Sequence, residues 1–267
     1  MWKWFAWTVL LGGIAPAQTV QAKVPPVPEM PANLAFEVAT IKPVDPGPHS
    51  GRLIRMENNH SYIATNFTLQ MLVAAAYRLN PHEVSGGTGW MRSDKFSIRA
   101  LTPGREKPTG SQQAEMLRTL LNERFHLKFH WEAKTLAVFV IVAPKGGGKL
   151  KTTQYPGEDA VVTSVVYRDH VELPARGATM NDFAAALQRV VLDRPVVDAT
   201  GIAGQYDFDL SWVPDESQYG GELQITPDST GEPLVVAMKN QLGLELKSAR
   251  RVVQTLVIDN ADQPDEN

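Results

Sequence analysis

The chain repeats itself, and this repetition constrains its fold more than any other feature of the sequence. Three segments of the first half recur in the second half, in the same order, with apolar residues at matching positions. The offsets are 179 − 68 = 111, 200 − 88 = 112 and 234 − 117 = 117 residues. The matched ranges are 68–76 with 179–187, 88–90 with 200–202, and 117–141 with 234–258. Three ordered matches at nearly constant spacing predict a tandem duplication.

The first matched segment of each half predicts a helix. Its apolar residues fall at i, i+3, i+4 and i+7, which places them on one helical face. They are Leu69, Leu72, Val73 and Ala76 in the first half, and Met180, Phe183, Ala184 and Leu187 in the second. Asn66 or Thr68 can cap the first of these helices. A second helix is expected at about 112–124 after Ser111, and at about 232–241 after Thr230.

Alternating side chains predict strands after these helices. Apolar and polar residues alternate along 125–131 and along 206–212, which is typical of half-buried, mainly antiparallel sheet. Gly89 and Gly201 lie between two strands of each half, where a positive φ is expected. A strand pair is expected before each first helix, at about 52–56 with 61–65 and 161–167 with 170–175.

These elements together predict an α+β fold of two tandem, internally duplicated β-α-β-β-α-β-β modules. Helices are expected to pack on one face of mainly antiparallel sheets. The first module is assigned to residues 35–150 and the second to residues 151–267, joined through a Gly-, Lys- and Thr-rich segment.

The first 22 residues have the layout of a secretory signal peptide. Lys3 supplies a positive charge, an apolar stretch follows, and small residues precede candidate cleavage sites after Ala17 and Ala22. The apolar stretch is too short for a bilayer span, which needs roughly 20 residues. An uncleaved anchor and a buried N-terminal element are the alternatives. Residues 23–34 are proline-rich and predict an extended linker, and the expected location is extracytoplasmic, periplasmic or secreted.

Composition excludes several classes of function. The formal net charge is −3, and −4 without Lys3 (25 − 29), so there is no overall positive charge for non-specific nucleic-acid binding. The absence of cysteine excludes disulfides, thiol catalysis and cysteine-ligated zinc or iron–sulfur clusters.

Motifs for metals and nucleotides are missing. His126 and His130 have a spacing that suits a metal on a helix, but the alternation around them indicates a strand, which separates them by about 13 Å. His82-Glu83 lacks the second histidine of a zinc-protease motif, and 144–150 departs from a phosphate-binding loop. We therefore predict no cofactor and no metal site.

No catalytic residue is assigned from the sequence. Asp207 and Asp209 lie on a polar strand face, where carboxylates are usually solvated, although a paired-carboxylate site stays an alternative. Asp182, Asp193 and Asp198 are expected to cap helices or stabilise loops. Trp90 is the best candidate for an aromatic binding residue, with a place in the helix–sheet core as the favoured alternative. Trp131 and Trp212 end apolar strand faces and are expected in the core as well.

Six motifs in order resemble the soil-associated protein family, an exported domain of unknown function that is abundant in acidobacteria. They span 36–43 (FEVATIKP), 66–77, 84–96, 120–125, 194–208 and 257–260 (VIDN). The resemblance covers nearly all of 35–267. It implies export, without established activity or catalytic residues. Related domains attached to antirepressor-type metallopeptidases imply sensing or binding, and each half is more weakly similar to the short N-terminal domain of secretins and TonB-dependent receptors.

The sequence therefore favours an exported, non-enzymatic binding or sensing domain for a protein, peptide or envelope ligand. An extracytoplasmic hydrolase acting on a glycan or peptide polymer is the alternative, and it requires titratable residues that converge in one pocket. A structural envelope protein is a further possibility. No nucleic-acid partner and no later transmembrane segment are expected, and the ligand-binding residues, the ligand and the oligomeric state are left open.

Overall fold

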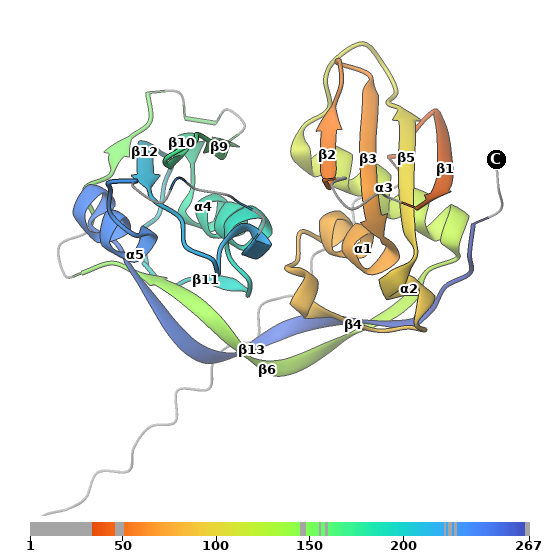
Figure 1. Cartoon of the computed structure of the whole chain (residues 1–267). Coiled ribbons are helices and arrows are strands. Elements are labelled where there is room, and N and C mark those ends of the chain that lie inside the picture. Colours follow the sequence, from red (N-terminus) through yellow and green to blue (C-terminus); the bar gives the residue numbers. More distant parts are fainter. Residues whose placement is uncertain are drawn as a thin grey trace, which may run out of the picture.

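The computed structural model describes residues 34–45, 51–144, 148–154, 156–157, 160–221, 223, 226 and 229–264. The expected signal peptide with Ala17 and Ala22, and residues 23–33 of the expected linker, lie outside these residues. Figure 1 shows two lobes side by side, joined beneath by a long two-stranded ribbon. The described part is a mixed structure of several sheets and five α-helices, which agrees with the predicted α+β class.

The first lobe has one antiparallel sheet in the order β1-β5-β3-β2, packed against helices. Its strands are β1 (Val38–Val44), β2 (Leu53–Met56), β3 (Ser61–Thr68) and β5 (Lys95–Leu101). Its helices are α1 (Leu69–Tyr77), the 3-10 turn η1 (Pro81–Glu83), α2 (Trp90–Ser93) and α3 (Gly110–Phe125). Thr68 caps α1 by accepting a bond from the Met71 N–H, and Thr109, rather than Ser111, caps α3.

The second lobe has the corresponding strand order, β7-β12-β10-β8, with β9 also paired to β10. Its strands are β7 (Lys151–Thr152), β8 (Val161–Val162), β9 (Val165–Val166), β10 (Val171–Ala178) and β12 (Tyr206–Trp212). Its helices are α4 (Met180–Ala186), the π-helical turn η2 (Leu187–Val191), η3 (Tyr219–Gly221), α5 (Leu234–Ala237) and the π-helical turn η4 (Met238–Leu242).

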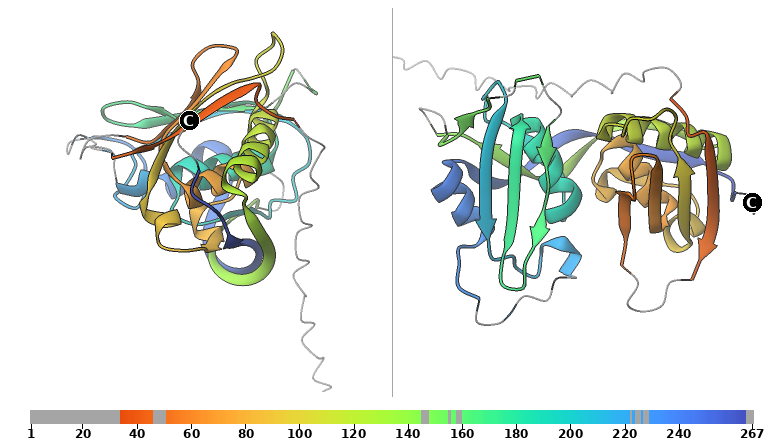
Figure 2. Two further views of the ribbon diagram at one scale, coloured as in Figure 1. Left: turned by 90° about the vertical axis from the view of Figure 1, so that its right-hand side faces the viewer. Right: turned by 90° about the horizontal axis from the view of Figure 1, so that it is seen from above.

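The ribbon consists of β6 (Lys128–Val142) and β13 (Glu245–Asn260), paired antiparallel along almost their whole length. The two strands expected after the second helix of each module are one continuous strand. Figure 2 shows the ribbon curling strongly. Three valines pack together on the face opposite Phe139 and Ile141: Val138, Val140 and Val253. This packing lets the ribbon bury apolar side chains on both faces.

A short strand of each half pairs with the long strand of the other half. In parallel register, β4 (Val84–Gly86) pairs with 256–258 of β13, and β11 (Val196–Asp198) pairs with 139–141 of β6. The two pairings are related by 196 − 84 = 112 and 256 − 139 = 117 residues. The duplication and the boundary at 150/151 stay predictions.

Each lobe has its own apolar core, and both cores use the ribbon. Leu256, Ile258 and Ala261 at the far end of the chain lie in the core of the first lobe. Ile141 lies in the core of the second lobe with Leu244 and Leu246. Each core is therefore closed by side chains that come from the other half of the sequence.

One backbone expectation is wrong and its counterpart is confirmed. Gly201 has φ +68°, as expected, whereas Gly89 has φ −53° because it is the N-cap of the short helix α2 and already has a right-handed helical conformation. Three tryptophans pack as expected: Trp90 and Trp131 against the first core, and Trp212 within the second.

Strands β8 and β9 form one interrupted edge strand. Both pair with β10 in the same register, since 162 + 175 and 166 + 171 both equal 337. Pro174 stands opposite the interruption and accepts a bond from the Thr163 N–H, but it has no N–H to donate in return. The missing donor explains why the ladder breaks at this point.

Candidate functional site at the junction of the lobes

The end of α1 in the first lobe meets the end of α4 and η2 in the second. The Asn80 side-chain amide donates to the main-chain oxygen of Gln188 at 2.9 Å and to that of Leu192 at 3.4 Å. The Gln188 side chain donates in return to the main-chain oxygen of Arg78 at 3.1 Å, and accepts from the Val196 N–H at 3.0 Å. Two amide side chains thus satisfy the carbonyls at both helix ends and join the lobes.

Arg78 and Arg189 both lie at this junction, because Gln188, the residue before Arg189, donates to the Arg78 main-chain oxygen. Arg78 follows α1 in the left-handed conformation, at φ +57°, and its guanidinium donates to the Ser111 hydroxyl at 3.3 Å. Loss of water and the positive charge of Arg78 lower the pKa of Arg189. Among the described residues, no ion pair includes either arginine. Two like charges, one from each lobe, therefore lie at this junction without an ion-pair partner among the described residues.

Glu83 is the buried carboxylate of the junction. It is 6% exposed and accepts a bond from the Asn80 N–H at 2.8 Å, while the Asn80 side chain accepts one from the His82 N–H. Burial raises the Glu83 pKa to about 7, although the Asn80 bond favours the charged form. The Glu83 carboxylate, which holds Asn80 in position against the second lobe, therefore titrates near neutral pH.

Half-buried aromatic rings anchor the ribbon beside this junction. Tyr77 makes edge contacts with Phe129 at 5.0 Å and Trp131 at 6.0 Å between ring centres. The Arg118 guanidinium lies over the Tyr77 ring at 5.6 Å. Burial raises the Tyr77 pKa to about 12. In the second lobe, Arg194 covers Phe139 in the same way at 4.8 Å.

The β8–β9 edge turns toward the other lobe. In Figures 1 and 2, β2 and the β8–β9 segment are the strands of their sheets nearest to the opposite lobe. Val161 and Val165 are 56% and 36% exposed, and Val166 and Tyr167 are exposed as well. The segment 160–167 (AVVTSVVY) has no charge and no proline, the usual devices that protect an edge strand.

Alternation of the ladder directs every second N–H donor of this edge outward, where none has a main-chain partner among the described residues. The Thr163 and Tyr167 N–H groups donate inward, to Pro174 and His170. The intervening Val162, Ser164 and Val166 therefore direct their N–H groups away from β10. The edge thus offers three main-chain donors flanked by valines on both faces of the sheet.

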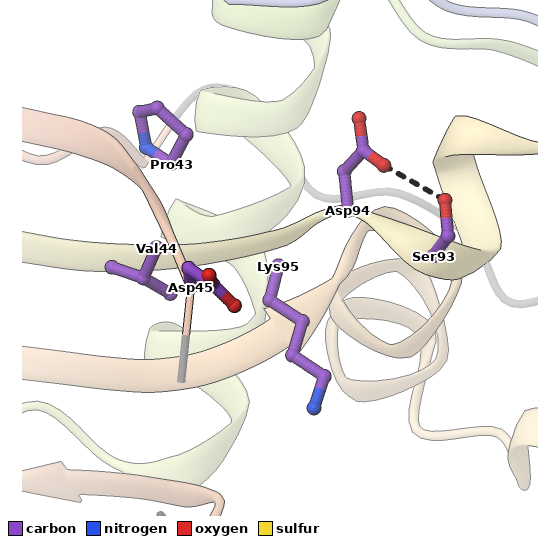
Figure 3. Close-up of a pocket in the computed structure, with 6 residues that line it drawn as sticks. All are labelled: Pro43, Val44, Asp45, Ser93, Asp94 and Lys95. Carbon is purple, nitrogen blue, oxygen red and sulfur yellow. Dashed lines mark hydrogen bonds between the residues drawn. The ribbon is translucent and has the colours of Figure 1, made fainter. Parts of the chain in front are cut away.

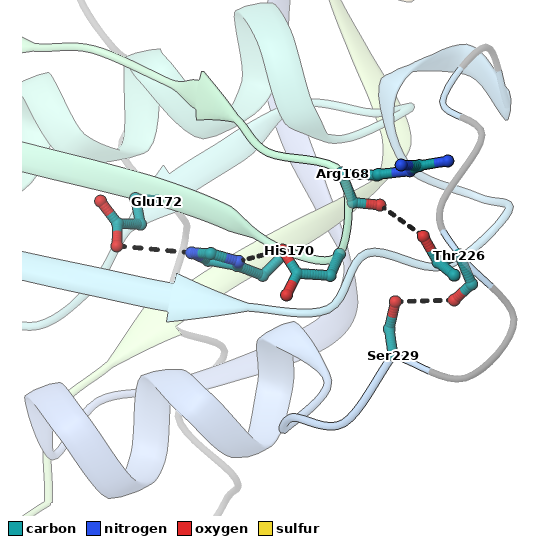
Figure 4. A network of polar contacts seen from close by, with 6 residues as sticks. Arg168, His170, Glu172, Thr226 and Ser229 are labelled. Carbon is teal, nitrogen blue, oxygen red and sulfur yellow. Dashed lines mark hydrogen bonds and ion pairs between the residues drawn. The ribbon is translucent and has the colours of Figure 1, made fainter.

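A polar network lies at the β9–β10 turn (Figure 4). The His170 ring contacts Asp169 at 2.7 Å and Glu172 at 3.4 Å, and it stacks on Tyr167 at 4.6 Å. The hydrogen bond with Asp169 is the main reason that the His170 pKa is raised and the Asp169 pKa is lowered. Across this turn, Thr226 donates to the Arg168 main-chain oxygen, and Ser229 donates to Thr226. These contacts hold the hairpin in place, and the described side-chain partners of the His170 ring are the carboxylates of Asp169 and Glu172.

A hollow of about 520 Å³ lies at the end of β1 (Figure 3). It is lined by Pro43, Val44, Asp45, Ser93, Asp94 and Lys95. The Asp94 carboxylate accepts bonds from Ser93 at 2.7 Å and from Gln263 at 3.1 Å. A smaller hollow, of about 250 Å³, lies between the start of β1 and α3. Because the first hollow borders residues 46–50, which are not described, we assign no site to it.

A family model described as a protein of unknown function, DUF3738, matches residues 70–261, which is most of the sequence. The chain belongs to this family. Neither curated proteins nor solved structures contain a match to this DUF3738 chain. The family description supplies no activity. The resemblance to the soil-associated family stays a prediction.

The histidines and aspartates singled out in the DUF3738 sequence do not form a shared site. His130 pairs with Asp259 at 2.8 Å and His126 with Asp262 at 3.2 Å, so the two histidines have different partners. Asp207 accepts a bond from the Gly177 N–H, which lowers its pKa, and Asp209 pairs with Arg176.

The three aspartates near α4 have capping and loop roles, as predicted. Asp182 completes the capping box of α4, Asp193 pairs with Arg194, and Asp198 accepts from the Thr200 N–H. Within the described ranges, no cluster of three or more metal-ligating side chains is present. No helix of the described chain is long and apolar enough to span a membrane.

Sequence reasoning missed the junction. Arg78 and Arg189 continue the first repeat alignment, since 189 − 78 = 111. That equivalence was the available signal, but it gives no reason for the ends of two matched helices to meet in space. The sequence of 161–167 predicts a strand but does not predict that its valines are exposed at a sheet edge.

Proposed function

We propose that this DUF3738 chain is an exported, non-enzymatic binding domain whose ligand is an extended segment of a protein or peptide in the cell envelope. The segment adds as a strand to the β8–β9 edge. The single observation that carries this proposal is the uncharged, valine-rich edge with three outward N–H donors. Edge pairing supplies affinity through the main chain, and alternate side chains supply selectivity.

The chemistry of the ligand follows from the edge. Val161 and Val165 lie opposite Arg176 and Glu172 on one face of the sheet. Val162 and Val166 lie opposite Ala175 and Val171 on the other face. A partner strand with small apolar or β-branched side chains complements both faces. Proline at positions that pair with the edge is disfavoured, because it removes a ladder donor.

Export is part of the same proposal. It is supported by the signal-type layout of residues 1–22. Cell fractionation with N-terminal sequencing of the mature protein tests it. A start after Ala17 or Ala22 is the expected result, and an intact cytoplasmic Met1 contradicts it.

Gene duplication is the proposed origin of the two lobes. It is supported by the shared strand order and by the reciprocal pairings at offsets of 112 and 117 residues. The sensing interpretation rests on the lobe junction, where a ligand that pairs with β8–β9 lies beside the opposite lobe. The hydrolase alternative has less support, because the described carboxylates form local ion pairs on strands and in turns.

The edge is tested by placing charges on it. Val161→Lys with Val165→Lys is the test variant, because inward or edge lysines block strand addition. Val235→Lys with Val236→Lys on α5 is the matched control, since these valines are 51% and 43% exposed. Capture of envelope proteins by the purified protein is compared between the two variants.

The proposal expects the edge variant to lose the captured partner and the α5 variant to retain it. Limited proteolysis of the partner then maps the bound segment. Equal capture by both variants contradicts strand addition at β8–β9. Loss in both variants, with unchanged melting temperatures, also contradicts it.

A further inference from the structure

The arginine pair at the lobe junction needs an explanation that the edge does not provide. Arg78 and Arg189 come from the two lobes and occupy matched positions, 111 residues apart. Both residues keep solvent-exposed surface that a dissolved ion can reach, although Arg189 has lost part of its contact with water. Within the described residues, the Arg189 side chain has neither a hydrogen bond nor an ion pair, and the Arg78 guanidinium donates only to the neutral Ser111 hydroxyl.

The usual role of arginine at a helix C-terminus is to pair with the last carbonyls. At this junction the amides of Asn80 and Gln188 bind the carbonyls of residues 78, 188 and 192 instead. The guanidiniums are therefore not needed as caps. Loss of water, followed by repulsion from Arg78, lowers the pKa of Arg189. No acidic side chain among the described residues pairs with either arginine to offset this repulsion.

We propose that Arg78 and Arg189 together form a binding site for one oxyanion, a phosphate or carboxylate group, which bridges the two lobes. Guanidinium groups present paired N–H donors that match the oxygen spacing of both kinds of group. One bound anion converts the repulsion between the lobes into attraction. This site is separate from the β8–β9 edge and does not depend on the proposed peptide binding.

The anchoring of Arg78 supports a preformed site. The Gln188 bond fixes its main chain, the left-handed turn ends α1 beneath it, and Ser111 orients its guanidinium. Gln188 also precedes Arg189 directly, so one residue positions both members of the pair. A ligand therefore meets two arginines whose backbones are already held.

The test uses the purified protein and inorganic phosphate at constant ionic strength, with melting temperature as the readout and acetate as a parallel arm. Phosphate is expected to raise the Tm by about 5 °C at a hundred-fold excess over its Kd. Arg78→Gln and Arg189→Gln are expected to abolish this rise. Arg92→Gln, at the exposed end of α2, is the matched control and is expected to retain the rise in Tm with phosphate. A response to acetate alone assigns a carboxylate ligand, and a response to phosphate alone assigns a phosphoryl group.

A second readout separates ligand binding from a structural role. Without added anion, relief of the repulsion leaves the Tm of Arg189→Gln equal to or above that of the wild type. A lower anion-free Tm in Arg189→Gln with a retained phosphate response overturns the proposal. It is also overturned if neither anion stabilises the wild type, or if all variants respond equally, which indicates an adventitious ion only.

Discussion

The side-chain amide of Asn80 donates a hydrogen bond to the main-chain oxygen of Gln188 at 2.9 Å, across 108 residues of sequence. Asn80 also belongs to a capping box with Glu83. Because Gln188 returns a bond to Arg78, the end of each first helix is completed by a side chain of the other lobe. The lobes are therefore joined twice, by this polar contact and by the ribbon.

Replacement of Asn80 tests the polar contact. Asn80→Ala removes one helix cap and leaves junction carbonyls without a donor, so we expect a loss of about 2–4 kcal/mol of unfolding free energy. Asn122→Ala, at an exposed position of α3, is the control and is expected to change the unfolding free energy little. Urea denaturation measures both. If Asn80→Ala loses less unfolding free energy than Asn122→Ala, the role assigned to Asn80 is contradicted.

Glu83 predicts a pH dependence of stability. Its pKa is raised in the folded state to about 7 from 4.5, so the folded state binds the proton more tightly. The protonated Glu83 carboxyl contributes fully to the free energy of unfolding below pH about 4.5. This contribution falls by roughly 2–3 kcal/mol as the pH rises to about 7. Glu83→Gln keeps an acceptor for Asn80 but cannot ionise. The difference in unfolding free energy between wild type and Glu83→Gln should change across this range, and a constant difference from pH 4 to 8 contradicts it.

Two glycines distinguish two reasons why alanine destabilises a fold: a steric clash of its Cβ and the strain of a positive φ. Gly86 and Gly104 both have φ near +80°, but a Cβ at Gly86 clashes with the main-chain oxygen of Ile258, whereas one at Gly104 meets open space. Gly104→Ala is expected to cost about 1 kcal/mol. Gly86→Ala must also separate β4 from β13, so we expect at least twice that cost in thermal unfolding. Equal costs for the two variants contradict the close pairing of β4 with β13.

The shared ribbon predicts cooperative unfolding. Leu256 is fully buried in the first core, and Leu256→Ala is expected to cost about 2–5 kcal/mol. Because β13 also closes the second core, amide exchange should rise in both lobes. Thr135→Ala, exposed on β6, is the control. Faster exchange confined to the first lobe contradicts a single cooperative unit.

The helices and strands with periodic apolar residues could be predicted from the sequence. The pairing of β4 with β13 and of β11 with β6, each across the two halves, could not. Apolar spacing around Leu72 and Phe183 predicts α1 and α4, because it reports one buried helix face. Spacing holds no information on which long strand accepts β4 or β11. The exchanged pairings depend on the three-dimensional path of the chain.

The junction of the lobes could not be predicted either, because it also depends on the three-dimensional path of the chain. Asn80 and Glu83 form a capping pattern that is local in sequence, but the burial that raises the Glu83 pKa comes from the folded structure. Arg78 and Arg189 are ordinary charged residues until the two helix ends meet. The exposure of Val161 and Val165 follows from their place on an edge strand, which the alternating pattern does not specify.

Selection from a library of random linear peptides tests the central claim most directly. Peptides selected on the wild-type protein should bind the Val235→Lys, Val236→Lys variant and fail to bind the Val161→Lys, Val165→Lys variant. On binding, amide exchange should slow at Val162, Ser164 and Val166, whose N–H groups point outward. Peptides that bind all three proteins equally, with exchange at those amides unchanged, would contradict strand addition at the β8–β9 edge.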